Sequence, residues 1–429
     1  MWITLFGSLF SLLLSGIWIG AALGITGVLI MQFWGSGLPL LGGAAFESIN
    51  VYGLIALPGF IFMGQIVLNS GLGERIYNSV SPLMARFPGK LLLSNVLICA
   101  MFAAVLGVST ANAAVVGSVA IPELRKRKYN EKLLLGTICG SGTLGLMIPP
   151  SGALVVYGVM ANTSIAALFA AATIPGILMA LGFMVFILVA GIIRPTIAPI
   201  DEKGLSAKET ARTLLGIWPL LLLMFVTVGP IYFGWATPAE GSGIGAISAL
   251  VFGKLFGKLH WKEVKESVIN STETSCMLFF LVIGAMILAA SVSTLGAPRA
   301  VVLMVGKLPL KPIVILMLLY LMYIIMGFFM DGISMMLVTI PFICPIIESL
   351  GFSLLWFGIP LVMVQEIGLM TPPVGLNLFV VQGIAGHNTP ISDVALGVMP
   401  LAIITTAILL LVTFFPETIF FLPRLLGLF

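Results

Sequence analysis

The chain has 429 residues, of which 60% are hydrophobic and only 8% are charged, and its mean hydropathy is +1.19. This composition excludes a soluble globular domain, which needs more charge to cover its surface, and favours a protein embedded in a bilayer. The apolar runs reach about 20 residues without alternating, so they favour membrane-spanning helices over a β-barrel. The net charge of +4 is small, but the uneven distribution of Lys and Arg along the chain indicates the topology.

The first half is predicted to contain a re-entrant hairpin at 91–122, with its tip near 107–112. Lys90 and Arg125 lie at its two ends, and an ordinary spanning helix would place these basic residues on opposite faces. Residues 1–34 are predicted as two short helices, with a single tilted helix as the alternative. The other predicted elements, in chain order, are a helix at 50–69, a segment near one face at 70–90, a helix at 133–159 broken at 148–150, and a returning helix at 166–193.

The second half follows a linker-like stretch at 195–213 and is predicted to have a similar order of elements. A second hairpin at 313–345 has its tip near 330–334, and the helix at 354–381 is broken at 371–373. The other predicted elements are helices at 214–232, 238–253 and 270–291, a segment near the periplasmic face at 292–311, and a last helix at 393–415.

One short sequence occurs twice, GLMIPP at 145–150 and GLMTPP at 368–373, an offset of 223 residues (368 − 145). Other short matches recur at the same offset, so we predict an internal duplication. The loop 123–132 carries five basic residues, whereas its partner 346–355 carries none. Because Lys and Arg are retained on the cytoplasmic side, the two copies are predicted to face opposite sides of the membrane, as inverted-topology repeats.

The two breaks predict ion-binding chemistry. Pro149 and Pro150 lack amide donors, so carbonyls of the preceding turn, such as those of Gly145 and Ile148, lose their helical partners. Unpaired backbone at membrane depth needs a partner, and a sodium ion suits carbonyl and hydroxyl oxygens. Side-chain oxygens near the breaks come from Ser109, Thr110, Asn112, Ser151, Thr371 and Asn377. The helix N-termini that follow the breaks suit a carboxylate.

Few ionisable residues lie in apolar surroundings, and such residues are functional candidates. The strongest candidates are Asp331, at the second hairpin tip, and Glu366, just before the second break. Arg299 is a candidate partner for a substrate carboxylate, with an interfacial arginine as the alternative. We find no nucleophile–base set, phosphate-binding loop or metal cluster, so no enzyme is expected. The basic run 125–128 is short and lies between membrane segments, so no nucleic-acid partner is expected.

At these residues the chain resembles the large membrane (M) subunit of tripartite ATP-independent periplasmic (TRAP) transporters, of the ion transporter superfamily. The resemblance covers essentially the whole length. It rests on the tip GVSTANAA at 107–114, on IPPS at 148–151 and on TPPVGLN at 371–377. It implies an all-α polytopic membrane protein of inverted repeats, with two re-entrant hairpins and two broken helices, that works as an elevator-type transporter in the bacterial inner membrane.

The resemblance and the offset together imply two sodium sites. The expected ligands of the first are Ser109, Asn112, Gly145, Ile148 and Ser151, and those of the second are Gly327, Gly332, Gly368, Thr371 and Val374. Substrate contacts are expected from Thr110, Arg299, Asp331 and Asn377.

The resemblance also implies a division of the chain and a set of partners. The expected sections are scaffold helices at 1–70, a first transport-domain half at 71–193, a cytoplasmic linker with scaffold helices at 194–292, and a second transport-domain half at 293–429. The implied partners are a small membrane (Q) subunit, a periplasmic substrate-binding protein and the lipid bilayer. The implied substrate is a carboxylate of the sialic acid or C4-dicarboxylate class, between which the sequence does not choose. The alternative is a stand-alone sodium/dicarboxylate symporter of the same superfamily.

Overall fold

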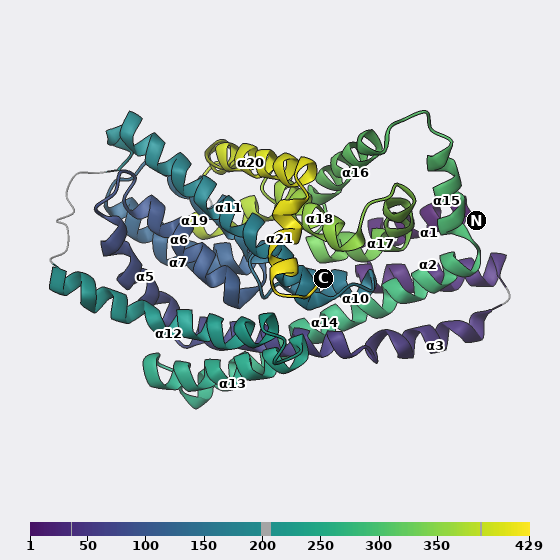
Figure 1. Cartoon of the computed structure of the whole chain (residues 1–429), viewed down its shortest axis with the longest axis horizontal. Helices are drawn as coiled ribbons and strands as arrows, with labels where there is room; N and C mark the ends of the chain where they lie inside the picture. Colours follow the sequence, from purple (N-terminus) through teal and green to yellow (C-terminus); the bar gives the residue numbers. More distant parts are fainter. Residues whose placement is uncertain (36, 199–206, 387) are drawn as a thin grey trace.

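The computed structural model describes residues 1–35, 37–198, 207–386 and 388–429, and these ranges form helices without any β-strand (Figure 1). The predicted linker at 195–213 falls partly outside the described residues, since 199–206 is not among them. The all-helical fold predicted from the apolar runs is confirmed for the described part of the chain.

The first half consists of short and long helices around one hairpin. Its elements are α1 (Trp2–Leu14), α2 (Ile19–Trp34), α3 (Leu38–Ile49), η1 (Tyr52–Ile55), α4 (Ala56–Asn69), α5 (Leu72–Met84), α6 (Leu91–Leu106), α7 (Ser109–Lys126), α8 (Glu131–Gly142), α9 (Leu144–Met147), α10 (Gly152–Met160) and α11 (Ile165–Ile193).

The second half repeats the pattern of a hairpin followed by an interrupted helix. Its elements are η2 (Pro195–Ile197), α12 (Ala207–Tyr232), α13 (Pro238–Phe256), α14 (Trp261–Thr294), α15 (Ala297–Gly306), α16 (Pro312–Gly327), α17 (Gly332–Ser349), α18 (Leu354–Leu369), α19 (Leu376–Ala385), α20 (Ile391–Phe414) and α21 (Glu417–Leu425).

Local capping signals begin several of these helices. The Asn130 side chain accepts from the Leu133 amide at 3.1 Å and begins α8. The Ser164 side chain accepts from the Ala167 amide at 3.3 Å and begins α11. Thr237 and Glu240 form a reciprocal capping box at the start of α13. Such caps satisfy amides that have no partner within the helix.

The N-terminal region has the two predicted helices and one further helix that was not predicted. Residues 1–34 form α1 and α2, so the prediction of two short helices is confirmed and the single tilted helix is wrong. The sequence prediction missed α3, because its glycines and proline are typical of a loop; the helix packs against α14. In the second half, the prediction placed the start of one helix at 270, whereas α14 begins at Trp261 after a capping box of His260 and Glu263.

Within the described ranges, five helical segments are long and apolar enough to cross a membrane, or six if the bent pair 131–147 and 152–160 counts as one span. The five are 52–69, α11, α14, α17 and α20. The axis of the bent pair turns by 40° at the first Pro-Pro break. Length and composition therefore support a multi-pass membrane protein, with several shorter apolar helices between the spans.

The hairpins α6–α7 and α16–α17 lie towards opposite ends of the molecule, with α18 between them (Figure 1). Every residue of α18 from Leu355 to Leu369 is buried, as expected for an apolar helix surrounded by protein. By contrast, α11 leaves large apolar side chains such as Leu181 and Val185 exposed, as expected for a lipid-facing helix.

Helix boundaries follow the offset of 223 residues seen in the sequence. Residues 109 and 126 bound α7, residues 332 and 349 bound α17, and α8 and α18 begin at 131 and 354. The helical segments after the breaks pack on the opposite hairpins, α10 on α17 and α19 on α7. Each break therefore carries the chain from its own half to the other half of the molecule.

Candidate ion and substrate site

The tip of the first hairpin lies directly against the first break. A β-carbon at Gly107 would lie 2.9 Å from the Pro150 carbonyl oxygen, and one at Gly145 would lie 2.8 Å from the Val108 carbonyl oxygen. Gly107 also has a φ of +62°, which favours glycine. Only glycine allows the two backbones to approach this closely.

The break itself leaves backbone oxygens in a buried place. After α9 the chain is extended at Ile148, and α10 begins after Ser151, whose hydroxyl accepts from the Leu154 amide at 3.4 Å. Both Pro-Pro bonds, 149–150 and 372–373, are cis. Gly145, Pro149, Pro150 and Ser151 are buried and Ile148 is half-buried, so the predicted first-site residues lie inside the protein.

A buried polar cluster joins this tip to the second broken helix. The Asn377 Nδ2 group at the start of α19 donates to Ser109 Oγ at 2.7 Å. Ser109 Oγ in turn donates to Glu366 Oε2 on α18 at 3.4 Å. The Asn112 side chain donates to the carbonyls of Cys99 at 3.0 Å and Gly142 at 3.2 Å. Three elements, α7, α18 and α19, thus meet at Ser109.

Several oxygens in this region have no hydrogen-bond partner among the described residues. These buried atoms are Asn112 Oδ1, Ser141 Oγ, Glu366 Oε1, Asn377 Oδ1 and Gln365 Oε1. An unsatisfied buried polar atom costs about 1–3 kcal/mol of folding free energy. A ligand that binds to several such atoms therefore stabilises the folded protein. The unpartnered atoms of this region are oxygens apart from Gln365 Nε2, so a hard cation fits it better than an anion does.

The second predicted site has the same close backbone approach but is more open. A β-carbon at Gly368 would lie 2.8 Å from Gly327 Cα, and one at Gly332 would lie 2.8 Å from Gln365 Oε1. The Thr371 hydroxyl donates to the Ile367 carbonyl. Thr371 and Val374 are half-buried, and the prolines between them are exposed. The two predicted sites therefore differ in access to the surroundings.

The predicted substrate residues lie in three places, beside Ser109, at the second tip and on α15. Thr110 is half-buried in the first turn of α7 and Asn377 is buried in the first turn of α19, so both lie beside Ser109. Asp331 is exposed at the second tip, where its carboxylate accepts from the amides of Ile333 and Ser334, each at 3.1 Å. Arg299 is exposed on α15 and is not part of the Ser109 cluster. A substrate contact for Asp331 or Arg299 stays a prediction.

Sequence reasoning missed three polar residues near the breaks, Ser141, Thr143 and Gln365. All three are buried in the helices that precede the prolines. The offset of 223 places Thr143 in correspondence with Glu366, so a search for buried polar residues within one turn before each repeated glycine would have found them.

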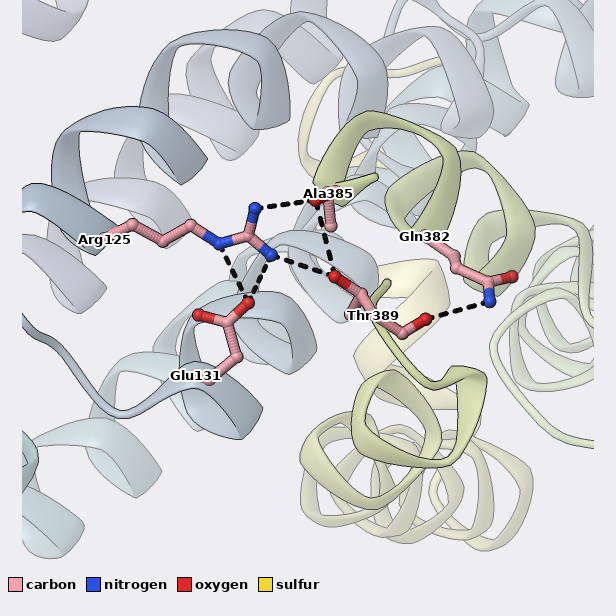
Figure 2. A network of polar contacts seen from close by, with 5 residues as sticks. All are labelled: Arg125, Glu131, Gln382, Ala385 and Thr389. Atoms are coloured by element: carbon pink, nitrogen blue, oxygen red, sulfur yellow. Dashed lines mark hydrogen bonds and ion pairs between the residues drawn. The ribbon is translucent and has the colours of Figure 1, made fainter. Parts of the chain in front are cut away.

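A second polar network joins the far end of the first hairpin to the end of the second broken helix (Figure 2). The Arg125 guanidinium donates to Glu131 Oε1 at 2.9 Å and 2.5 Å, to the Ala385 carbonyl at 2.6 Å and to the Thr389 hydroxyl at 3.0 Å. Gln382 donates to the Thr389 carbonyl at 3.0 Å. A cation at the last carbonyls of α19 is also favoured by the helix dipole. The network therefore ties α7 to α19 at the end remote from Ser109.

Comparisons with known proteins agree with this architecture. Residues 6–418 match the family described as "Tripartite ATP-independent periplasmic transporter, DctM component". The chain is 33% identical to the C4-dicarboxylate TRAP transporter large permease protein DctM of Pseudomonas aeruginosa, over 95% of this chain and 94% of that protein. It is 28% identical to the sialic acid TRAP transporter large permease protein SiaM of Vibrio cholerae, over 90% of this chain and 88% of that protein.

A solved structure shares the fold. The YdaH transporter of Alcanivorax borkumensis superposes with a TM-score of 0.65 at 14% identity, covering 89% of this chain and 90% of that one. The relatives are permeases and not enzymes. The chain therefore belongs to the DctM component family and is a large membrane subunit of the tripartite ATP-independent periplasmic transporters.

Proposed function

We propose that this subunit carries a small organic acid of the sialic acid or C4-dicarboxylate class across the bacterial inner membrane in symport with sodium. It would do so with a small membrane (Q) subunit and a periplasmic substrate-binding protein. The observation that carries the proposal is the buried, oxygen-rich cluster where α7, α18 and α19 meet beside the first helix break.

The cluster supports sodium as the coupling ion through its chemistry. Asn112, Ser141 and Asn377 each have a buried side-chain oxygen without a partner. Near them, the break at 148–150 leaves carbonyls outside the helical hydrogen-bond ladder. Carbonyl, amide and hydroxyl oxygens at half-helix ends are typical ligands of sodium in secondary transporters.

Helix N-termini support an acidic substrate. The first turns of α7 and α19 meet at Ser109 and Asn377, and α10 begins beyond the Pro150 carbonyl that contacts the tip. Each N-terminus presents free amides and partial positive charge, which favour a carboxylate. Relatives named for C4-dicarboxylates and for sialic acids both have substrates with this group, so the carboxylate is the feature that the site is proposed to recognise.

The packing is compatible with an elevator movement. Helices α2 and α14 pack on each other, as do α4 and α13, and α14 also packs on α4, which supplies a continuous set of scaffold helices. The hairpins and broken helices would move against this set as one body, since α19 packs on α7 and α10 on α17. The inverted orientation of the two halves, the division into four sections and the inner-membrane location belong to the same proposal.

The tripartite assignment is preferred to a stand-alone symporter, because the match to large TRAP permeases extends over almost the whole chain. The test is uptake in proteoliposomes that contain this chain and the small membrane subunit. Uptake of sialic acid or a C4-dicarboxylate should require both an inward sodium gradient and the binding protein. Saturable uptake without the binding protein would favour the stand-alone symporter, and uptake that persists without sodium would contradict sodium coupling.

A further inference from the structure

Glu366 is a buried acidic residue at the contact between the two halves. It lies on α18, two residues before Gly368, and none of its surface is exposed. Its Oε2 accepts from the Ser109 hydroxyl at 3.4 Å. Its other oxygen, Oε1, has no partner among the described residues.

No positive charge of the described residues compensates this carboxyl group. The ion pairs found among them involve Arg125, Arg127, Lys132 and Arg424, and none reaches Glu366. A buried carboxylate without a counter-charge is strongly unfavourable. Such a group is either protonated or accompanied by a bound cation, and the unpartnered oxygens Glu366 Oε1 and Asn377 Oδ1 favour the cation.

The surrounding atoms show which cation site that is. Glu366 accepts a hydrogen bond from Ser109, the first residue of α7. This end of α7 belongs to the first hairpin tip, which lies against the first break. The neighbouring Asn377 contributes a second buried oxygen without a partner from the same broken helix. The tip residues, the break carbonyls and these two side chains surround one region, although they come from opposite halves of the chain.

We propose that Glu366 is an anionic ligand of the first sodium site, so that the second broken helix supplies the charge of a site otherwise built by the first half. The proposal rests on the sodium coupling proposed above. A sodium ion bound there would hold α7 and α18 together and so link the two halves. The corresponding position in the first half is Thr143, a neutral residue, so the second site receives no equivalent charge.

Sodium binding can be measured apart from transport. The full chain, purified with its small membrane subunit, is unfolded by heat over a series of sodium chloride concentrations, with choline chloride keeping the ionic strength constant. A ligand that binds the folded state raises the unfolding temperature by mass action. Glu366→Gln keeps the size of the side chain and removes the charge. It should shift the sodium concentration of half-maximal stabilisation upwards by at least about tenfold, the usual scale of losses around a metal site.

Control variants separate the possible results. Glu47→Gln makes the same chemical change at an exposed position on α3 and should leave the sodium response unchanged. Ser109→Ala should weaken the response through the first site. If Glu366→Gln keeps the wild-type sodium midpoint while the midpoint of Ser109→Ala rises, the proposal for Glu366 is wrong and sodium coupling stands. If the wild-type protein is not stabilised by sodium more than by choline, both proposals are wrong.

A second variant decides the question if Glu366→Gln does not fold. Glu366→Asp keeps the charge but withdraws it by one methylene, so it should respond to sodium with a higher midpoint than the wild type. An aspartate variant with the wild-type midpoint would overturn the proposal, because a direct ligand cannot be shortened without weakening the bond to the ion.

Discussion

The close contact between Gly145 and the first hairpin tip predicts a measurable cost for a single added methyl group. In Gly145→Ala the new β-carbon would lie 2.8 Å from the Val108 carbonyl oxygen, 3.0 Å from its carbonyl carbon and 3.2 Å from Asn112 Cβ. All three distances are shorter than the separation of about 3.5–4.0 Å at which non-bonded carbons attract. Either the tip or the break must therefore move.

The size of the effect follows from two opposing terms. Overpacking a closely packed interior costs about 1–3 kcal/mol, whereas Gly→Ala in a helix gains about 1 kcal/mol from helix propensity. Gly43→Ala is the matched control, because Gly43 lies in α3, is exposed and has no atom within 4 Å of the added methyl. The control should gain the propensity term alone, so the two variants should differ by about 1–3 kcal/mol.

The assay is thermal unfolding of both variants and the wild type in the same detergent, with and without sodium. We expect Gly145→Ala to unfold at a lower temperature than Gly43→Ala. We also expect a weaker stabilisation by sodium, because the tip no longer lies against the break carbonyls. If Gly145→Ala unfolds together with the control and retains the full sodium response, the inferred contact between tip and break is incorrect.

Three further predictions concern topology, the second polar network and the partner surface. Single cysteines at Lys128 and Ser353, in a background that lacks the four native cysteines, should react with impermeant reagents from opposite sides of the membrane; reaction from one side would disprove the inversion. Arg125→Ala should lower the free energy of unfolding by about 1–3 kcal/mol, because charged hydrogen bonds to α8, α19 and Thr389 are lost. Lys132→Ala, which loses an ion pair with Asp393 at the protein surface, should cost about 0–1 kcal/mol; equal costs in chemical denaturation would argue against the network. Lys307→Glu combined with Lys311→Glu should slow uptake at limiting binding protein, most clearly at low ionic strength where exposed charges act over longer distances; wild-type uptake at every binding-protein concentration in low salt would indicate that these lysines do not contact the partner.

Much of the architecture could be predicted from local signals. The apolar runs indicate membrane helices, and the repeated Pro-Pro sequences mark both interruptions, between Met147 and Gly152 and between Leu369 and Leu376. The glycine at 107 correctly marks the first tip, because a left-handed residue ends α6 there. These features depend on residues close together in the chain, for which sequence patterns are informative.

The parts that sequence reasoning missed depend on distant contacts. The hydrogen bond from Asn377 to Ser109 joins residues 268 positions apart, and it exists because α19 packs on the opposite hairpin. The sequence prediction therefore placed Asn377 only at the second break. Likewise α3 is stabilised by packing on α14, although its own glycines and proline disfavour a helix.

Sodium and an organic acid are proposed to move together through this subunit. The most direct measurement follows radioactive sodium in proteoliposomes that contain the chain and its small membrane subunit, with binding protein and acid added outside. Sodium entry should increase when the loaded binding protein is added and should return to the background level without the acid. Acid accumulation that is accompanied by no extra sodium entry would contradict sodium-coupled transport.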